Sequence, residues 1–217
     1  MKLEKIDGAK LKEMTISSVQ FLDENRETVD ALNVFPVPDG DTGTNMSATL
    51  TSAAKEMEKV RSDDISEVAD AISRGALKGA RGNSGVILSQ LFRGFAKGLE
   101  GKSAVNTAEY AQALKAGADT AYKAVMKPIE GTMLTVARVT AEEAQKIAIE
   151  NMDFILFYEK IIGVAKDILD KTPDMLPALK EAGVVDSGGM GILYILMGSN
   201  KALNGDFNYI EFMAAEP

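Results

Sequence analysis

The chain has 217 residues, 46% of them hydrophobic, and carries a formal net charge of −8 with no cysteine and no histidine. This composition predicts a packed core of one substantial domain or two small ones, and the missing residues exclude disulfides, Ser-His-Asp triads and His-rich zinc sites. The acidic charge argues against nucleic acid as a partner, and the absence of a long apolar run or a signal-peptide core predicts a cytoplasmic protein with no transmembrane segment.

Apolar residues recur at helical spacing along nearly the whole chain. They predict helices over about 9–32, 44–60, 65–77, 83–99, from 107 to the proline at 128, 132–149, from 153 onward, a short helix ending at 183, and 186–203. Thr172 and Pro173 are read as the N-cap and first residue of the short helix. Residues 101–106 are predicted to be a loop.

Eight or so helices with short connections predict an all-α fold, an antiparallel bundle or barrel of about eight helices. We assign residues 1–205 to this one domain and 206–217 to a tail, a short strand or the start of a linker to a missing C-terminal part. Small residues between 111 and 121 predict close packing of the helix that begins near 107. Four methionines are expected to fill the core: Met126, Met133, Met190 and Met197.

The loop over residues 34–46 has the composition of a binding site. Two prolines stiffen it, and Asp39 and Asp41 present two carboxylates one residue apart. Carboxylate oxygens suit a hard cation such as Mg²⁺. Thr44 or Asn45 can cap the helix that follows, and the free N–H groups at such a helix N-terminus favour phosphate. The loop therefore predicts a site for a Mg²⁺-bound nucleotide.

Four loops with ligand-like chemistry each precede a helix, at 39–46, 78–85, 127–133 and 185–191. In an antiparallel array, the loops after alternate helices lie at the same end, so the first three gather at one end. The fourth joins them if the short eighth helix counts as one pass. Convergence of these loops predicts a nucleotide site at one end of the fold. Lys78 and Arg81 either add positive charge there or form a solvated basic pair.

Three other site types are excluded by the spacing of residues. An EF-hand counted from Asp39 would need glutamate where Leu50 stands, and a P-loop ending at Ser103 would need glycine at Ala96. The turn that begins at Asp186 resembles a protease nucleophile turn, but the chain has no histidine to act as its base.

Four motifs carry a family resemblance: NVFPVPDGDTGTNM at 33–46, GARGNSGVI at 79–87, EGTML at 130–134 and VDSGG at 185–189. In this order they resemble the N-terminal domain of the bacterial fatty acid kinase catalytic subunit, which belongs with the nucleotide-binding subunit of dihydroxyacetone kinase. The resemblance covers nearly the whole chain. It implies an antiparallel barrel of about eight helices with the nucleotide at one end.

The resemblance also implies roles for residues. Asp39 and Asp41 would be the catalytic residues, holding two Mg²⁺ ions that bridge the phosphates of ATP. Asn33 is the neutral nearest match to a third metal-binding aspartate of the dihydroxyacetone kinase branch, and Thr42 stands where that branch has histidine. The implied nucleotide-binding residues are Thr44, Asn45, Met46, Asn83, Ser84, Gly85, Gly131, Thr132, Met133, Asp186, Ser187 and Gly188.

The expected activity is ATP- and Mg²⁺-dependent phosphoryl transfer to the carboxylate of a fatty acid, presented by a separate fatty-acid-binding carrier protein, to give an acyl phosphate. A carboxylate is already ionised at neutral pH, so this reaction needs no general base. Two alternatives stay open: an ADP- or ATP-binding subunit of a dihydroxyacetone-type kinase, and a non-catalytic nucleotide-binding interaction domain. Inactivity of the isolated domain, and a homodimer formed through regions outside this chain, are also left open.

Overall fold

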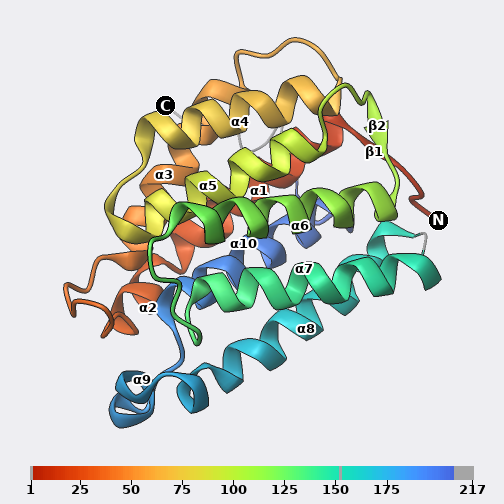
Figure 1. Ribbon diagram of the computed structural model, residues 1–217. Helices are drawn as coiled ribbons and strands as arrows, with labels where there is room; N and C mark the ends of the chain where they lie inside the picture. The colour runs from red at the N-terminus through yellow and green to blue at the C-terminus, as the bar shows by residue number, and fades with distance from the viewer. Residues whose placement is uncertain (1, 152, 208–217) are drawn as a thin grey trace.

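The computed structural model describes residues 2–151 and 153–207, and helices dominate them (Figure 1). The helices are α1 (Gly8–Glu24), α2 (Arg26–Ala31), α3 (Thr42–Met57), α4 (Ile65–Gly79), α5 (Gly82–Gly98), α6 (Thr107–Ala124), α7 (Met133–Glu150), α8 (Phe154–Met175), α9 (Pro177–Ala182) and α10 (Ser187–Leu203). The predicted all-α class is confirmed. The predicted tail or linker lies outside the described residues from 208 onward.

Eight of these helices form a closed ring. The ring consists, in chain order, of α1, α3, α4, α5, α6, α7, α8 and α10. Each helix packs against the next one, and α10 packs against α1. The last contact is polar as well as apolar, because Ser17 Oγ donates to the Gly198 carbonyl at 2.6 Å and Ser18 Oγ donates to the Ile195 carbonyl at 2.8 Å. Ring neighbours run antiparallel, and the short α2 and α9 lie outside the ring (Figure 1).

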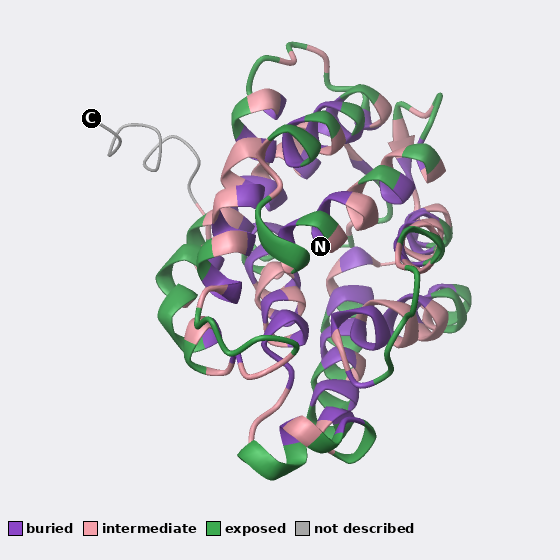
Figure 2. Cartoon of the chain, turned by 60° about the vertical axis from the view of Figure 1, so that its left-hand side comes forward, coloured by how far each residue is buried: buried purple, intermediate pink, exposed green. Residues whose placement is uncertain are grey.

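The core lies on the inner faces of the ring helices, where buried residues gather (Figure 2). Leu88 and Phe95 of α5 and its C-cap residue Leu99 are all buried, as their predicted place on one helical face requires. Met126 is wrongly predicted: it is fully exposed, because α6 ends at Ala124 and the next residues form a loop over the surface.

The pair α5 and α6 packs closely through small residues, as the sequence predicts. A Cβ atom added to Gly94 would lie 2.3 Å from the Ala116 carbonyl oxygen, and one added to Gly117 would lie 2.7 Å from the Leu91 carbonyl oxygen. Only glycine leaves room for backbones this near to each other.

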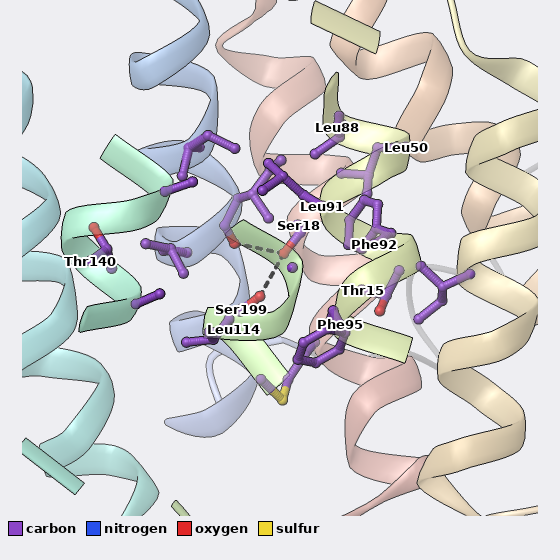
Figure 3. Close-up of a pocket in the computed structure, with 18 of the residues that line it drawn as sticks. Thr15, Ser18, Leu50, Leu88, Leu91, Phe92, Phe95, Leu114, Thr140 and Ser199 are labelled. Atoms are coloured by element: carbon purple, nitrogen blue, oxygen red, sulfur yellow. Dashed lines mark hydrogen bonds between the residues drawn. The ribbon is translucent and has the colours of Figure 1, made fainter. Parts of the chain in front are cut away.

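The ring encloses an apolar cavity of about 130 Å³, lined by residues of all eight ring helices. Leu88 and Phe92 of α5 lie on one side of it and Thr140 of α7 on the other (Figure 3). The hydroxyls of Ser18 and Ser199 are 2.8 Å apart at its wall (Figure 3). The cavity follows from the geometry of a closed ring, whose inner side chains do not quite meet on the axis.

Two predicted helix boundaries are wrong. The first helix breaks at Asn25, whose side-chain amide donates to the Phe21 carbonyl and ends α1 before α2 begins. Pro173 lies inside α8 and does not start the short helix, which begins at Pro177. Proline at 173 cannot donate to the Leu169 carbonyl, but Thr172 Oγ1 donates to that oxygen at 2.7 Å, so α8 continues.

The predicted loop over 101–106 contains a short strand, β2 (Ala104–Val105), which pairs antiparallel with β1 (Ile6–Asp7). This pair lies at the end of the barrel away from α2 and α9 (Figure 1). No helix among the described residues combines the length and apolarity needed to cross a membrane.

Candidate functional site

A pocket of about 600 Å³ opens where the N-termini of α3, α5, α7 and α10 meet. All four predicted loops contribute to its wall. The predicted site residues that line it are Asn33, Asp39, Asp41, Asn45, Asn83, Ser84, Thr132, Met133, Asp186, Ser187 and Gly188. The fourth loop joins the other three, but the predicted condition is wrong. The short helix α9 is only six residues long and does not count as a pass, so α8 alone returns the chain to this end of the barrel.

Four helix N-termini, the positive ends of the helix dipoles, meet at the pocket. In α3, α5 and α7 no side chain hydrogen-bonds to the first-turn amides as an N-cap, and the first turn of each of the four helices has no acidic residue. Three of these helices have a first-turn amide that donates to an aspartate: Thr44 of α3 to Asp30, and Met133 of α7 and Gly189 of α10 to Asp186. The first-turn amides of α5 have no side-chain partner among the described residues, and such free N–H groups, with the helix dipole, favour an anion. An anion such as phosphate is therefore the class of ligand that the N-terminus of α5 suits.

The acidic loop is held in shape by Asn33, which is 7% exposed. Its side-chain amide donates to the Val37 carbonyl at 3.1 Å, and its side-chain oxygen accepts from the Asp41 amide at 3.1 Å. These two bonds close the loop around exposed Asp39 and half-buried Asp41. These hydrogen bonds make Asn33 a residue that stabilises the loop, and its role as a metal ligand stays a prediction.

Two carboxylates of the pocket are the candidate metal ligands. Within the described ranges, no group of three or more acidic, histidine or cysteine side chains is already arranged to hold a metal ion. Asp39 and Asp41 both line the pocket, and their oxygens fit a hard cation that completes its shell with phosphate oxygens and water.

Thr44 is not the helix cap that the sequence predicts. The N-cap of α3 is Asp41, and Thr44 lies within the first turn. Both its amide, at 2.9 Å, and its hydroxyl, at 2.7 Å, donate to the carboxylate of Asp30 on α2. Asp30 thus joins α2 to the start of α3, and Thr44 is not among the residues that line the pocket.

The first two loops are in direct contact. Gly82 has φ +64°, and a Cβ atom there would lie 2.5 Å from the side-chain amide nitrogen of Asn45. Gly85 is not at the pocket wall; it faces α3, where a Cβ atom would lie 2.5 Å from Thr49 Oγ1. Its role is to let α5 approach α3, and this approach places Asn83 and Ser84 at the pocket.

Asp186 ties two helix N-termini together. It is 4% exposed and accepts from the Gly189 amide at 2.8 Å and from the backbone of Met133. Burial raises the pKa of Asp186 to about 6, although both hydrogen bonds act to lower it. Ser187 Oγ donates to Thr42 Oγ1 at 3.1 Å, which links α10 to α3. These contacts fix the relative positions of three pocket walls.

Two more predicted residues do not line the pocket. Met46 is fully buried in the core, where its sulfur packs against Gly191 of α10. Gly131 is buried behind Thr132, against the end of α8.

The apolar lining and the cation were not among the predicted site residues, although Lys127 and Ile129 lie in the third predicted loop. Phe35, Ile87, Val125 and Ile129 are among the residues of the wall, and Lys127 is the only lysine or arginine among the described residues that line it. Lys78, predicted as a possible source of charge, instead lies 3.5 Å from Glu56, and Arg81 does not line the wall. A signal for Lys127 was present, since it stands three residues before the EGTML motif.

The chain is similar to a described protein family and to several bacterial proteins. A family model described as the DAK2 domain matches residues 36–201, a range that starts in the acidic loop and ends in α10. Protein YloV of Bacillus subtilis is 52% identical over 206 residues, which cover 95% of this chain and 37% of YloV. Uncharacterized proteins of Staphylococcus saprophyticus and Staphylococcus aureus are 52% identical over 204 residues, which cover 94% of this chain. The chain spans 37% of the length of each of these relatives.

Proposed function

The chain belongs to the DAK2 domain family, and on that premise we propose that it is the Mg²⁺- and ATP-binding domain of a kinase that phosphorylates the carboxylate of a fatty acid. One observation carries the nucleotide assignment: four helix N-termini and two carboxylates meet at one pocket of an otherwise acidic protein. A magnesium nucleotide is the ligand class that needs both features at once.

The chemistry divides between the two sides of the pocket. Asp39 and Asp41 would hold Mg²⁺, which, when bound, neutralises charge on the phosphates. The first-turn amides of α5, beside Asn83 and Ser84, are placed to donate to phosphate oxygens. Apolar residues of the wall, such as Val125, offer a surface for the nucleotide base.

The acceptor follows from the acid–base groups. The chain has no histidine, and the transfer of a phosphoryl group to an ionised carboxylate needs no proton acceptor. Because the chain spans only 37% of its longer relatives, the whole reaction can require segments beyond this domain. We therefore propose a separate fatty-acid-binding protein as the partner that delivers the acyl group, and a cytoplasmic location for both.

The first experiment is a calorimetric titration with ATP, with and without Mg²⁺. We expect Mg²⁺-dependent binding that is lost in Asp39→Ala and in Asp41→Ala. Asp70→Ala is the matched control, because Asp70 is an exposed carboxylate on α4 whose one ion pair with a described residue is with Arg74, at 3.2 Å. Unchanged binding in both pocket variants would refute the site assignment.

A second candidate is a nucleotide-binding subunit of a dihydroxyacetone-type kinase, which the family match favours. The two candidate functions differ in the molecule that accepts the phosphoryl group. Mg-ATP with a fatty acid on its carrier should give acyl phosphate under the first proposal, whereas ADP that stays bound through purification and is phosphorylated in place favours the second. Nucleotide binding without transfer to either acceptor indicates a non-catalytic interaction domain.

A further inference from the structure

The loop between α6 and α7, residues 125–132, carries the only cation found in the described part of the pocket wall. Lys127 is exposed and forms no ion pair with any described residue. A lysine side chain has several rotatable bonds, so its ammonium contributes to binding only if the backbone beneath it is held in place. What fixes this loop therefore matters for the chemistry of the pocket.

Glu130 anchors the loop to both flanking helices. Its carboxylate accepts from Tyr122 at 3.1 Å, from Thr135 at 2.6 Å and from Arg138 at 3.1 Å. Tyr122 belongs to the last turn of α6, and the other two donors belong to the first turns of α7. Three donors from two helices thus converge on one side chain, three residues after Lys127.

The backbone next to Glu130 is anchored as well. The Gly131 amide donates to Thr135 Oγ1 at 2.9 Å, and Thr132 Oγ1 donates to the Ile129 carbonyl at 2.8 Å. Gly131 has φ +87°, and a Cβ atom there would lie 2.9 Å from the Leu176 Cβ. The loop is therefore pressed against the end of α8 on one side and bonded to α7 on the other.

Glu130 keeps its charge in this setting. Burial acts to raise the pKa of Glu130, but the hydrogen bonds from Thr135, Arg138 and Tyr122 outweigh burial, and the pKa lies below its ordinary value. The Arg138 guanidinium also lies 5.8 Å from the centre of the Tyr122 ring. An anionic Glu130 and a cationic Arg138 make the strongest class of hydrogen bond available to such an anchor.

We propose that Glu130 is a positioning residue that holds the 125–132 loop so that the Lys127 ammonium contacts the phosphate chain of the bound nucleotide. The inference rests on the proposed function, because it takes a nucleotide as the ligand. Neither role is visible in the helix pattern of the sequence. Lys127 supplies the charge, and Glu130 acts only through the loop that carries it.

The test is a titration of single and double variants with two probes, Mg-ATP and adenosine. Lys127→Met should weaken Mg-ATP binding about tenfold, as expected for loss of one charge-assisted hydrogen bond, and leave adenosine binding unchanged. Glu130→Gln should weaken Mg-ATP binding in the same direction. The double variant should bind Mg-ATP no more weakly than Lys127→Met alone, because Glu130 acts through Lys127. Glu142→Gln is the control: it removes the other ion pair of Arg138, at 3.3 Å, and leaves the loop bonded.

Amide hydrogen exchange without nucleotide tests the anchor by itself. We expect Glu130→Gln, but not Glu142→Gln, to speed exchange in residues 125–131. Unchanged exchange would overturn the anchoring role, and additive losses of affinity in the double variant would overturn action through Lys127. If exchange rises as expected but the wild-type protein binds no Mg-ATP, the proposed function has failed and the nucleotide contact of Lys127 fails with it, while the anchor stands.

Discussion

The contact between α5 and α6 makes a sharp prediction about stability, with Gly94→Ala as the perturbation. The new methyl group would lie 2.3 Å from the Ala116 carbonyl oxygen and 2.7 Å from the Gly117 Cα. Both are backbone atoms, which cannot rotate out of the way. The two helices must therefore separate by roughly 1 Å to restore ordinary contact distances.

The magnitude follows from two opposing effects. Overpacking of this kind typically lowers the free energy of unfolding by about 1–3 kcal/mol, whereas alanine in place of a helical glycine raises it by about 1 kcal/mol. Because the contact is with backbone, we expect the high end of the loss and a net destabilisation of about 1–2 kcal/mol. For a chain of this size, that corresponds to a fall of roughly 2–8 °C in the melting temperature.

Gly163→Ala is the matched control. Gly163 also lies inside a long helix, α8, but a Cβ atom there would have no neighbour within 4 Å. We expect this variant to be more stable than the wild type by about 0.5–1 kcal/mol, from helix propensity alone. Urea unfolding followed by circular dichroism measures both variants. If Gly94→Ala is as stable as Gly163→Ala, the close approach of α5 and α6 is not as described.

Three further predictions concern side chains. The pKa of Asp186 is raised to about 6 from its ordinary 3.8, so the folded state binds this proton more tightly than the unfolded state does. The free energy of unfolding should therefore rise as the pH falls from about 6.5 to about 4.5, by up to about 1.4 kcal/mol per pH unit. Urea unfolding at stepped pH should show this slope in the wild type and lose it in Asp186→Asn; an equal slope in both would contradict the assignment. Asn106 accepts from the Glu109 amide at 2.9 Å in a capping box, so Asn106→Ala should lower the free energy of unfolding by about 1 kcal/mol in the same assay, and no change would mean that the cap is not formed. Tyr110→Phe removes a buried hydroxyl that bonds to the Tyr158 hydroxyl, and Tyr158 keeps its hydrogen bond to Ser199. Thermal unfolding should show that the free energy of unfolding falls by about 1 kcal/mol, and a fall of more than about 3 kcal/mol would mean that Tyr158 is left unpaired.

The helices and the end of the barrel that holds the pocket could be predicted from sequence. Helical periodicity located the ring helices, because one face of each is buried, as Leu88 and Phe95 show for α5. Antiparallel order then placed the loops, since the direction of each helix follows from the one before it. The separate α2 was missed because apolar spacing continues through Asn25, and the break depends on one side-chain bond.

The details of the site depend on contacts between distant residues and could not be predicted in the same way. Thr44 has the composition of a cap but bonds to Asp30, fourteen residues earlier. Met46 lies next to predicted ligands in sequence, but a helix turns successive residues to different faces, and its face is the core. The role of Asn33 in stabilising the loop could not be predicted without the positions of both Val37 and Asp41.

The contact between α1 and α10, which closes the ring, determines the stage of synthesis at which the domain can fold. The bond between Ser17 and Gly198 joins residues 181 apart, so the ring stays open until α10 has left the ribosome. The same helix brings Asp186 and Ser187 to the pocket, so a nascent chain that stops short of it lacks both the closed barrel and one wall of the site. Cooperative folding of this domain therefore waits until α10 has been made, and until then the apolar inner faces of the earlier helices need protection from aggregation.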